Sequence, residues 1–237
     1  MSKTITIEIP KDLSEISLKE YQKYIKVVNY NDREKPTQDE LDFANLKMLE
    51  YFCGITMKEA YELPLSDFSH ILNHLTKIFK EDTPLQRTFT MKDPNGVERK
   101  FGVMPKIDDM TLGEFIDLEK YVQSWETMHK AMAVLYRPIT FEKGNLYLIE
   151  DYEGSDKYSS VMQDAPLNVP LGASVFFYHL GTELLNHIVH SLNNHLKNKE
   201  VEEVFQKNGV GINQFMELLK ATSQNLTKLQ NFPYFNV

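Results

Sequence analysis

A short pattern of residues occurs twice in the chain and sets how two of its helices begin. Residues 15–21 read Glu-Ile-Ser-Leu-Lys-Glu-Tyr, and residues 109–115 read Asp-Met-Thr-Leu-Gly-Glu-Phe. In each copy a Ser or Thr, Ser17 or Thr111, stands three residues before a Glu, which is the capping box of a helix N-terminus. A few residues before each copy, an apolar residue is followed by Pro and Lys. The repeat therefore predicts two strand-to-helix connections of one kind, and it contains no reactive group.

The same capping box occurs at two further places. Thr37 and Thr56 also stand three residues before a Glu, so four helix starts are marked. The helix that begins at Thr37 is predicted to end at Cys53, because the following Gly54 is the residue type that most often terminates helices. Apolar residues spaced i, i+3, i+4 and i+7 predict a further amphipathic helix over residues 68–79.

Two stretches have the alternation and the turn residues of β-hairpins. Residues 86–104 alternate on both sides of an Asn-Gly pair, which favours tight hairpin turns. Residues 139–149 show a similar pattern around Lys-Gly-Asn. The opening residues 4–9 also alternate, and an isolated hairpin is only marginally stable in water. We therefore expect the N-terminal strand and the hairpins to form one small antiparallel sheet.

Two longer helices are predicted after the first hairpin. Residues 112–136 place apolar side chains along one side of a continuous helix that ends before Pro138. Residues 171–196 carry apolar residues alternately four and three apart, which is the spacing of a coiled-coil seam. Bulky groups on its other faces, such as Phe176, favour a packed central helix over a two-stranded coil. A homo-oligomer formed through this seam is the alternative.

Together these patterns predict an α+β fold that is predominantly helical. The small antiparallel sheet, with the N-terminal strand plus hairpin 86–104, accompanies a helical bundle around the long central helix. We expect a subdomain over residues 1–105 and a helical subdomain with a second small hairpin over residues 106–237, or one compact domain. The 237 residues are 42% apolar, which can support a core. The single cysteine, Cys53, excludes an internal disulfide.

Charge and hydropathy argue against two classes of partner. The net charge is −8 and the 26 Lys and Arg residues are scattered, whereas duplex nucleic acid requires a concentrated basic face. We therefore expect no nucleic acid as the main ligand. No apolar run reaches the roughly 18 residues of a bilayer span, so we expect no membrane association. The alternating N-terminal residues lack the apolar core of a signal peptide, and we expect a cytoplasmic protein.

No group of residues has the spacing of a catalytic, cofactor or metal site. His70 and His74 lie four apart, but on the polar side of their predicted helix. His187 and His190 lack further metal ligands nearby. The sequence contains neither a phosphate-binding loop nor a nucleophile elbow. We therefore expect no catalytic residue, no cofactor and no metal, and we expect that the protein is not an enzyme.

One cation is predicted to be partly buried. Arg137 directly follows residues 131–136, which are apolar all round. We expect its guanidinium to interact with the carbonyl groups at the C-terminus of the preceding helix. Recognition of an anion is the alternative.

The C-terminal tail carries three closely spaced aromatic residues, Phe232, Tyr234 and Phe235. Aromatic side chains are common anchors in protein interfaces, so these residues are the candidate partner-binding site. Docking of the same side chains on the chain's own fold is the alternative.

Parts of the chain resemble small proteins from the virion genes of tailed bacteriophages. The resemblance spans about residues 104 to 190 and is carried by these segments and residues: 110–119, Trp125, 133–139 and 171–181. Such proteins are often tail assembly chaperones or structural proteins. The shared residues resemble determinants of fold, so the resemblance implies no catalytic site.

The resemblance implies a non-enzymatic assembly protein. A protein of this kind binds phage structural subunits or the tape-measure protein in the host cytoplasm during virion morphogenesis. The alternative is a permanent virion component, such as a head–tail connector or a ring subunit. A chaperone is missing from purified particles, whereas a structural subunit is present there in a fixed copy number.

Overall fold

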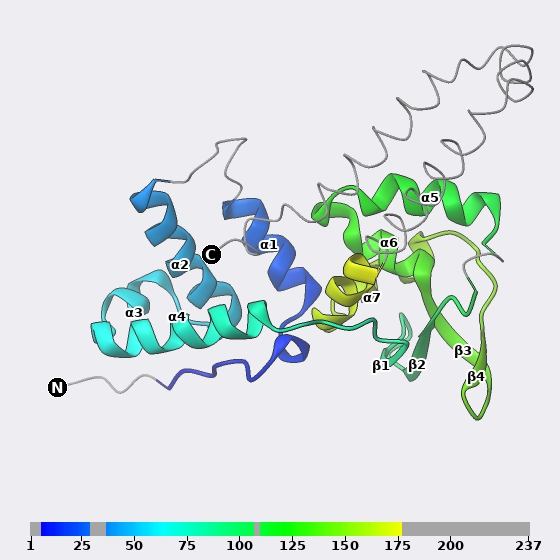
Figure 1. The fold of residues 1–237 in the computed structure, drawn as a ribbon, viewed down its shortest axis with the longest axis horizontal. Coiled ribbons are helices and arrows are strands. Elements are labelled where there is room, and N and C mark those ends of the chain that lie inside the picture. The colour runs from blue at the N-terminus through cyan, green and yellow to red at the C-terminus, as the bar shows by residue number, and fades with distance from the viewer. Residues whose placement is uncertain (1–5, 29–36, 107–109, 177–237) are drawn as a thin grey trace, which may run out of the picture. The chain divides into compact units, whose positions relative to one another are not determined.

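The computed structural model describes residues 6–28, 37–106 and 110–176 (Figure 1). The chain divides into two compact units, residues 1–171 and residues 172–237. The description below concerns the first unit. The terminal aromatics and most of the predicted coiled-coil seam lie outside the described residues.

The N-terminal part of this unit is helical. A short 3-10 helix and four α-helices follow one another: η1 (Leu13–Glu15), α1 (Leu18–Val28), α2 (Gln38–Cys53), α3 (Met57–Tyr61) and α4 (Leu65–Lys80). The predicted capping boxes at Ser17, Thr37 and Thr56 are confirmed, since each hydroxyl accepts from the N–H of the Glu three residues later. Gly54 ends α2 with φ of 67°, a left-handed conformation that glycine adopts without strain.

Aromatic side chains join these helices in a common core. Tyr21 of α1 stacks on Phe79 of α4 and makes an edge contact with Trp125. Tyr24, one turn further along α1, packs against Phe52 of α2. The apolar faces of α1, α2 and α4 therefore meet, as the helical spacing of their apolar residues predicts.

The sheet is built from the two hairpins. Its four antiparallel strands are adjacent in chain order: β1 (Thr88–Lys92), β2 (Glu98–Val103), β3 (Tyr136–Lys143) and β4 (Leu146–Ile149). Both predicted hairpins are confirmed, and Phe101 of β2 lies opposite Pro138 of β3 where they join. The predicted N-terminal strand is not a member of this sheet: residues 6–10 have no strand assignment. The second hairpin provides the partner that the first one needs.

Two glycines are required by the sheet. Gly96 has φ of 78° in the β1–β2 turn, where the Asp93 carboxylate accepts from the N–H groups of Asn95 and Val97. Gly102 has a different role. An added Cβ there would lie 2.6 Å from a ring carbon of Tyr147, so this ring can cross β2 only at a glycine.

The long helix predicted over residues 112–136 is wrong, because the structure breaks it. It consists of α5 (Leu112–Val122), the 3-10 turn η3 (Trp125–Thr127) and α6 (Met128–Leu135). Ser124 has an extended backbone, and its hydroxyl accepts from the Glu126 N–H as an N-cap. A serine hydroxyl readily bonds nearby backbone N–H groups outside a regular helix, and here this bond interrupts the helix between α5 and α6.

The second half of the broken helix is deeply buried. From Ala131 to Leu135 every residue of α6 is almost inaccessible, as predicted for its all-apolar sequence. The chain then passes directly into β3 at Tyr136, and the Met104 N–H donates to the Leu135 carbonyl beside this junction. The short helix α7 (Asp156–Met162), also predicted, packs on α6, and its Tyr158 makes an edge contact with Phe101.

The architecture agrees with the predicted fold class. It is α+β and predominantly helical, with a small antiparallel sheet. Among the described residues, no helix has both the length and the apolar character needed to cross a membrane.

Candidate protein-interaction surface on helix α5

Helix α5 turns a charged side chain towards the interior. Glu114 and Arg137 are both buried, and Arg137 Nη2 lies 2.7 Å from Glu114 Oε1. The other carboxylate oxygen accepts from the N–H and the hydroxyl of Thr111, each at 2.7 Å. One carboxylate thus caps its own helix and binds a cation from β3. Because the same carboxylate bonds both Thr111 and Arg137, it fixes the N-terminus of α5 on the sheet.

A second polar pair lies one turn along the same side of α5. The Tyr152 hydroxyl donates to Asp117 Oδ2 at 2.5 Å, and the Tyr152 ring lies 5.6 Å from the Arg137 guanidinium carbon. Burial raises the pKa of the Tyr152 phenol, and its hydrogen bond to the Asp117 carboxylate raises it further. The inward side of α5 is therefore held by a polar cluster made of Thr111, Glu114, Asp117, Arg137 and Tyr152.

The outward side of α5 is apolar. Leu112, Phe115 and Ile116 are 74%, 53% and 52% exposed. Their i, i+3, i+4 spacing places them on one stripe, and at about 100° per residue Glu114 and Asp117 point to the opposite side. This polarity is the reverse of an ordinary surface helix, whose apolar stripe faces the core. We call Leu112, Phe115 and Ile116 the α5 face.

The first copy of the repeated motif shows the ordinary arrangement. Leu18 and Tyr21 are 0% and 1% exposed, although they occupy the motif positions of Leu112 and Phe115. Both copies begin with the same capping box, so the local backbone chemistry does not cause the difference. The second copy thus leaves exposed the two apolar side chains that the first copy buries.

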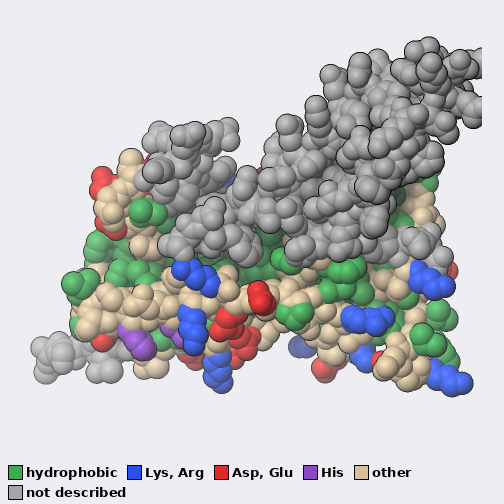
Figure 2. All heavy atoms as spheres, in the orientation of Figure 1, with side chains coloured by type: hydrophobic (Ala, Val, Ile, Leu, Met, Phe, Trp, Pro, Cys, Tyr) green, Lys and Arg blue, Asp and Glu red, His purple; other side chains and the backbone are tan. Residues whose placement is uncertain are grey.

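A second apolar surface lies on the β3–β4 hairpin. Phe141 pairs with Leu148 across the two strands, and Lys143 pairs with Leu146, so these side chains share one face of the hairpin. Phe141, Leu146 and Leu148 are all exposed. The hairpin reaches away from the rest of the sheet in Figure 1, and green side chains lie beside a blue one at its tip in Figure 2.

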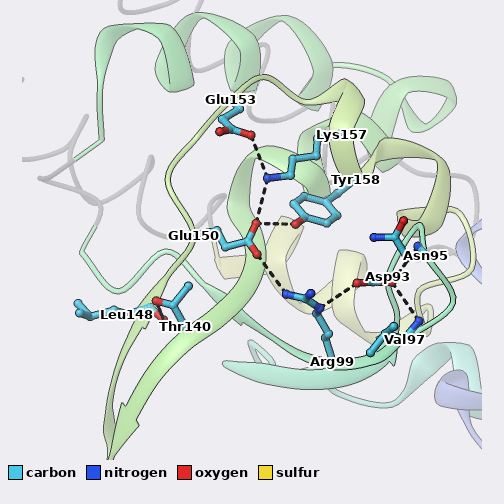
Figure 3. A network of polar contacts seen from close by, with 10 residues as sticks. All are labelled: Asp93, Asn95, Val97, Arg99, Thr140, Leu148, Glu150, Glu153, Lys157 and Tyr158. Atoms are coloured by element: carbon cyan, nitrogen blue, oxygen red, sulfur yellow. Dashed lines mark hydrogen bonds and ion pairs between the residues drawn. The ribbon is translucent and has the colours of Figure 1, made fainter.

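The base of this hairpin is held by a network of charges (Figure 3). The Glu150 carboxylate, which follows β4, binds Arg99 from β2 at 3.3 Å and Lys157 from α7 at 3.1 Å. It also accepts from the Tyr158 hydroxyl at 2.5 Å. Burial acts to raise the pKa of Glu150, but the hydrogen bonds from Tyr158 and Lys157 and the Arg99 charge outweigh it and leave the pKa lowered.

The same network extends to the β1–β2 turn. Arg99 Nε lies 2.8 Å from the Asp93 carboxylate, which is itself buried. Burial of the Tyr158 phenol and its hydrogen bond to Glu150 raise the pKa of Tyr158 to about 12, so this hydroxyl stays a donor at neutral pH. These contacts tie two hairpins and α7 together, which is a structural role.

The structure describes only some of the residues that the sequence analysis singled out. Phe232, Tyr234 and Phe235, with His187 and His190, lie outside the described residues. His70 is exposed as predicted, but His74 is half-buried and its Nε2 lies 2.8 Å from the Pro10 carbonyl oxygen. Within residues 6–28, 37–106 and 110–176, no group of three or more His, Cys, Asp or Glu is placed to hold a metal ion.

Arg137 is buried, more completely than predicted, but its partner differs from the prediction. The expected interaction was with carbonyl groups at the end of the preceding helix, whereas the observed ion pair is with Glu114. The reason is that Arg137 belongs to β3, from which its guanidinium reaches the Glu114 carboxylate of α5.

Comparisons with known proteins add no relative. The chain matches no model of a protein family, and searches of curated proteins and of solved structures found no match.

Proposed function

We propose that this chain is a non-enzymatic assembly protein of a tailed bacteriophage. It binds structural subunits, or their tape-measure partner, in the host cytoplasm, in the manner of a tail assembly chaperone. The supporting observation is the reversed polarity of α5, which buries Glu114 and exposes Phe115. Apolar side chains gathered on an exposed helix are typical of surfaces that bind other proteins.

The arrangement beneath α5 also suits this role. A binding helix must keep its apolar side outward, although burial of that side within its own fold is favourable. The ion pair between Glu114 and Arg137 opposes such a rotation, because turning α5 inward would break it and leave a charge buried without its partner. The phage assignment itself rests on the sequence resemblance, and α5 lies within the segment that carries it.

The test uses the phage that encodes the chain. An affinity-tagged chain is recovered from infected cells, and its bound proteins are identified by mass spectrometry alongside the proteins of purified particles. A chaperone co-purifies with tail subunits and is missing from the particles. If the wild-type chain binds no virion protein, the proposal is wrong.

Matched variants link that binding to the surface. Phe115→Ser with Ile116→Ser removes two side chains of the α5 face and should abolish recovery of the subunits. Tyr61→Ser with Leu65→Ser changes two residues that are also exposed, near the start of α4, and should leave recovery unchanged. Equal losses from both pairs would remove the support that α5 gives to the proposal.

The second candidate is a permanent virion component, such as a head–tail connector or ring subunit. The β3–β4 hairpin favours it, because the exposed Phe141, Leu146 and Leu148 would suit a lasting contact between subunits. Particle composition separates the candidates, since a structural subunit appears in purified particles at a fixed copy number.

A further inference from the structure

Strand β4 forms one edge of the sheet (Figure 1). Within the described residues it pairs with β3 on one side only. Backbone groups of successive residues in a strand point to opposite sides. The Glu150 N–H donates to the Pro138 carbonyl of β3 at 2.9 Å, so Leu148 also directs its backbone groups towards β3. Tyr147 and Ile149 therefore direct theirs outward, where a further strand would bind.

The β4 edge lacks the features that usually prevent strands of different molecules from pairing. Such edges are commonly protected by a lysine, a proline or a β-bulge. The sequence of β4 is Leu-Tyr-Leu-Ile, and the irregularity of the hairpin falls in β3, between Ile139 and Phe141. The other edge strand, β1, reads Thr-Phe-Thr-Met-Lys and alternates polar with apolar residues. Of the two edges, β4 is therefore the one better suited to accept another strand.

Apolar side chains of the hairpin add contact area to this edge. Phe141, Leu146 and Leu148 are 56%, 78% and 61% exposed. At about 150–250 Å² for a large side chain, they expose roughly 350 Å² together. Each partner of a stable dimer buries about 800 Å², so backbone pairing along β4 has to supply the rest. The area is that of a reversible dimer and not of a permanent one.

The two outward residues define a register in which β4 pairs with itself. In an antiparallel pair, residues that exchange both backbone bonds lie directly opposite each other. Tyr147 of one copy opposite Ile149 of the other satisfies the outward groups of both, and two-fold symmetry repeats the exchange. Leu148 then lies opposite Leu148 of the second copy. Tyr147 opposite itself would instead place Ile149 opposite Asn145, which lies in the hairpin turn.

Charges at the two ends of the hairpin favour the same antiparallel arrangement. The exposed Lys143 lies next to the turn, whereas the acidic Glu150, Asp151 and Glu153 follow the end of β4. In this register the turn of one copy lies beside the acidic end of the other, so opposite charges meet at both ends. A parallel arrangement would bring like charges together. A second copy of the chain is thus complementary in backbone groups, apolar side chains and charge.

We propose that two copies of the chain pair antiparallel through β4, so that their sheets become one continuous sheet. Leu148 packs on Leu148 of the second copy, and Phe141 and Leu146 extend the apolar contact. The contact uses none of the residues of the α5 face. It goes beyond the proposed function, because a chaperone and a virion subunit would form it alike.

The test is the oligomeric state of the purified full-length chain, measured by sedimentation velocity from about 1 to about 100 μM. The wild type should shift reversibly from the 27.6 kDa monomer to a dimer as its concentration rises. Leu148→Lys places like charges opposite each other and should raise the dissociation constant at least about tenfold. Leu65→Lys changes an exposed residue on α4 and is the matched control, which should leave the constant unchanged.

A pair of oppositely charged variants tests the register. Leu148→Glu should weaken self-association as Leu148→Lys does. An equimolar mixture of the two variants should form a heterodimer, because the register places the two substituted side chains opposite each other. Leu148 is exposed in the single chain, so each variant should fold like the wild type, with an unchanged circular dichroism spectrum.

Three results contradict this dimer. The first is a wild-type chain that stays monomeric over the whole range, the second is a dimer that Leu148→Lys leaves intact, and the third is a mixture of variants that associates no better than either alone. A monomeric chain that loses a virion protein through Leu148→Lys would show that a strand of that protein occupies the edge. Failure of the proposed function looks different, because the tagged chain then recovers no virion protein, whether or not it dimerises.

Discussion

Arg137 and Glu114 form an ion pair of 2.7 Å in which both side chains are nearly excluded from solvent. The pair joins strand β3 of the sheet to helix α5. Its carboxylate also accepts from Thr111, so the helix cap and the tertiary contact share one group. This double use explains how α5 stays fixed while its apolar stripe points outward.

Removing the cation should be costly. Arg137→Met leaves the Glu114 carboxylate buried without its partner, and breaking a buried pair in this way costs about 3–5 kcal/mol. Unfolding in urea, followed by circular dichroism, gives the free energy of unfolding for each variant.

Adding Glu114→Gln to that variant should restore most of the lost stability. Glutamine keeps an acceptor for the Thr111 N–H, as capping boxes allow, and carries no charge that needs compensation. A double variant as unstable as Arg137→Met alone would show that the ion pair is not the source of the loss.

The two motif copies should respond differently to the same substitution. Leu18→Ala removes a fully buried side chain and should cost about 2–5 kcal/mol. Leu112→Ala changes an exposed side chain at the same motif position and should shift stability by no more than about 0.5 kcal/mol. Urea unfolding of the isolated chain measures both. Equal losses would mean that the α5 face is buried in solution.

Features that depend on residues close in sequence were predicted well. The capping boxes, the Gly54 helix end and both hairpins rest on side chains within a few positions of the backbone they control. The break at Ser124 was missed because apolar spacing continued through it, and only the backbone at that residue shows that its hydroxyl caps a new turn.

The orientation of α5 could not be read from the sequence. Its two sides were both visible, one with Leu112, Phe115 and Ile116 and the other with Glu114 and Asp117. Which side is buried depends on Arg137 and Tyr152, and these come from β3 and from the segment after β4. The rule that a helix buries its apolar stripe predicts the wrong side for α5. It considers the helix alone and takes no account of Arg137, the buried cation that β3 contributes.

Two glycines should respond oppositely to alanine. At Gly102 the new Cβ would meet the Tyr147 ring at 2.6 Å and Ile139 at 3.0 Å, and such overpacking costs about 1–3 kcal/mol. At Gly113, in the first turn of α5, no atom lies within 4 Å of the new Cβ. Gly113→Ala should therefore stabilise the chain by up to about 1 kcal/mol. Thermal unfolding measures both, and a tolerated Gly102→Ala would contradict the close crossing of Tyr147.

Glu150 should make the stability of the sheet depend on acid pH. Its pKa in the folded chain lies below the ordinary value of 4.5, because hydrogen bonds and cations outweigh the effect of burial. The folded state therefore binds this proton less readily than the unfolded state. The resulting stabilisation is complete above about pH 4.5 and is lost as the pH falls through the lowered pKa.

Glu150→Gln should lower stability at neutral pH and flatten the decline of stability between about pH 5 and about pH 3, the range around the ordinary carboxyl pKa. Glu153→Gln is the matched control. Glu153 also binds Lys157, at 2.9 Å, but it is exposed and makes no contact with Arg99 in the described structure, so its replacement should change little. Urea midpoints measured across this range decide the outcome. If Glu150→Gln declines as steeply as the wild type, other carboxylates dominate the acid response and the network in Figure 3 contributes little to it.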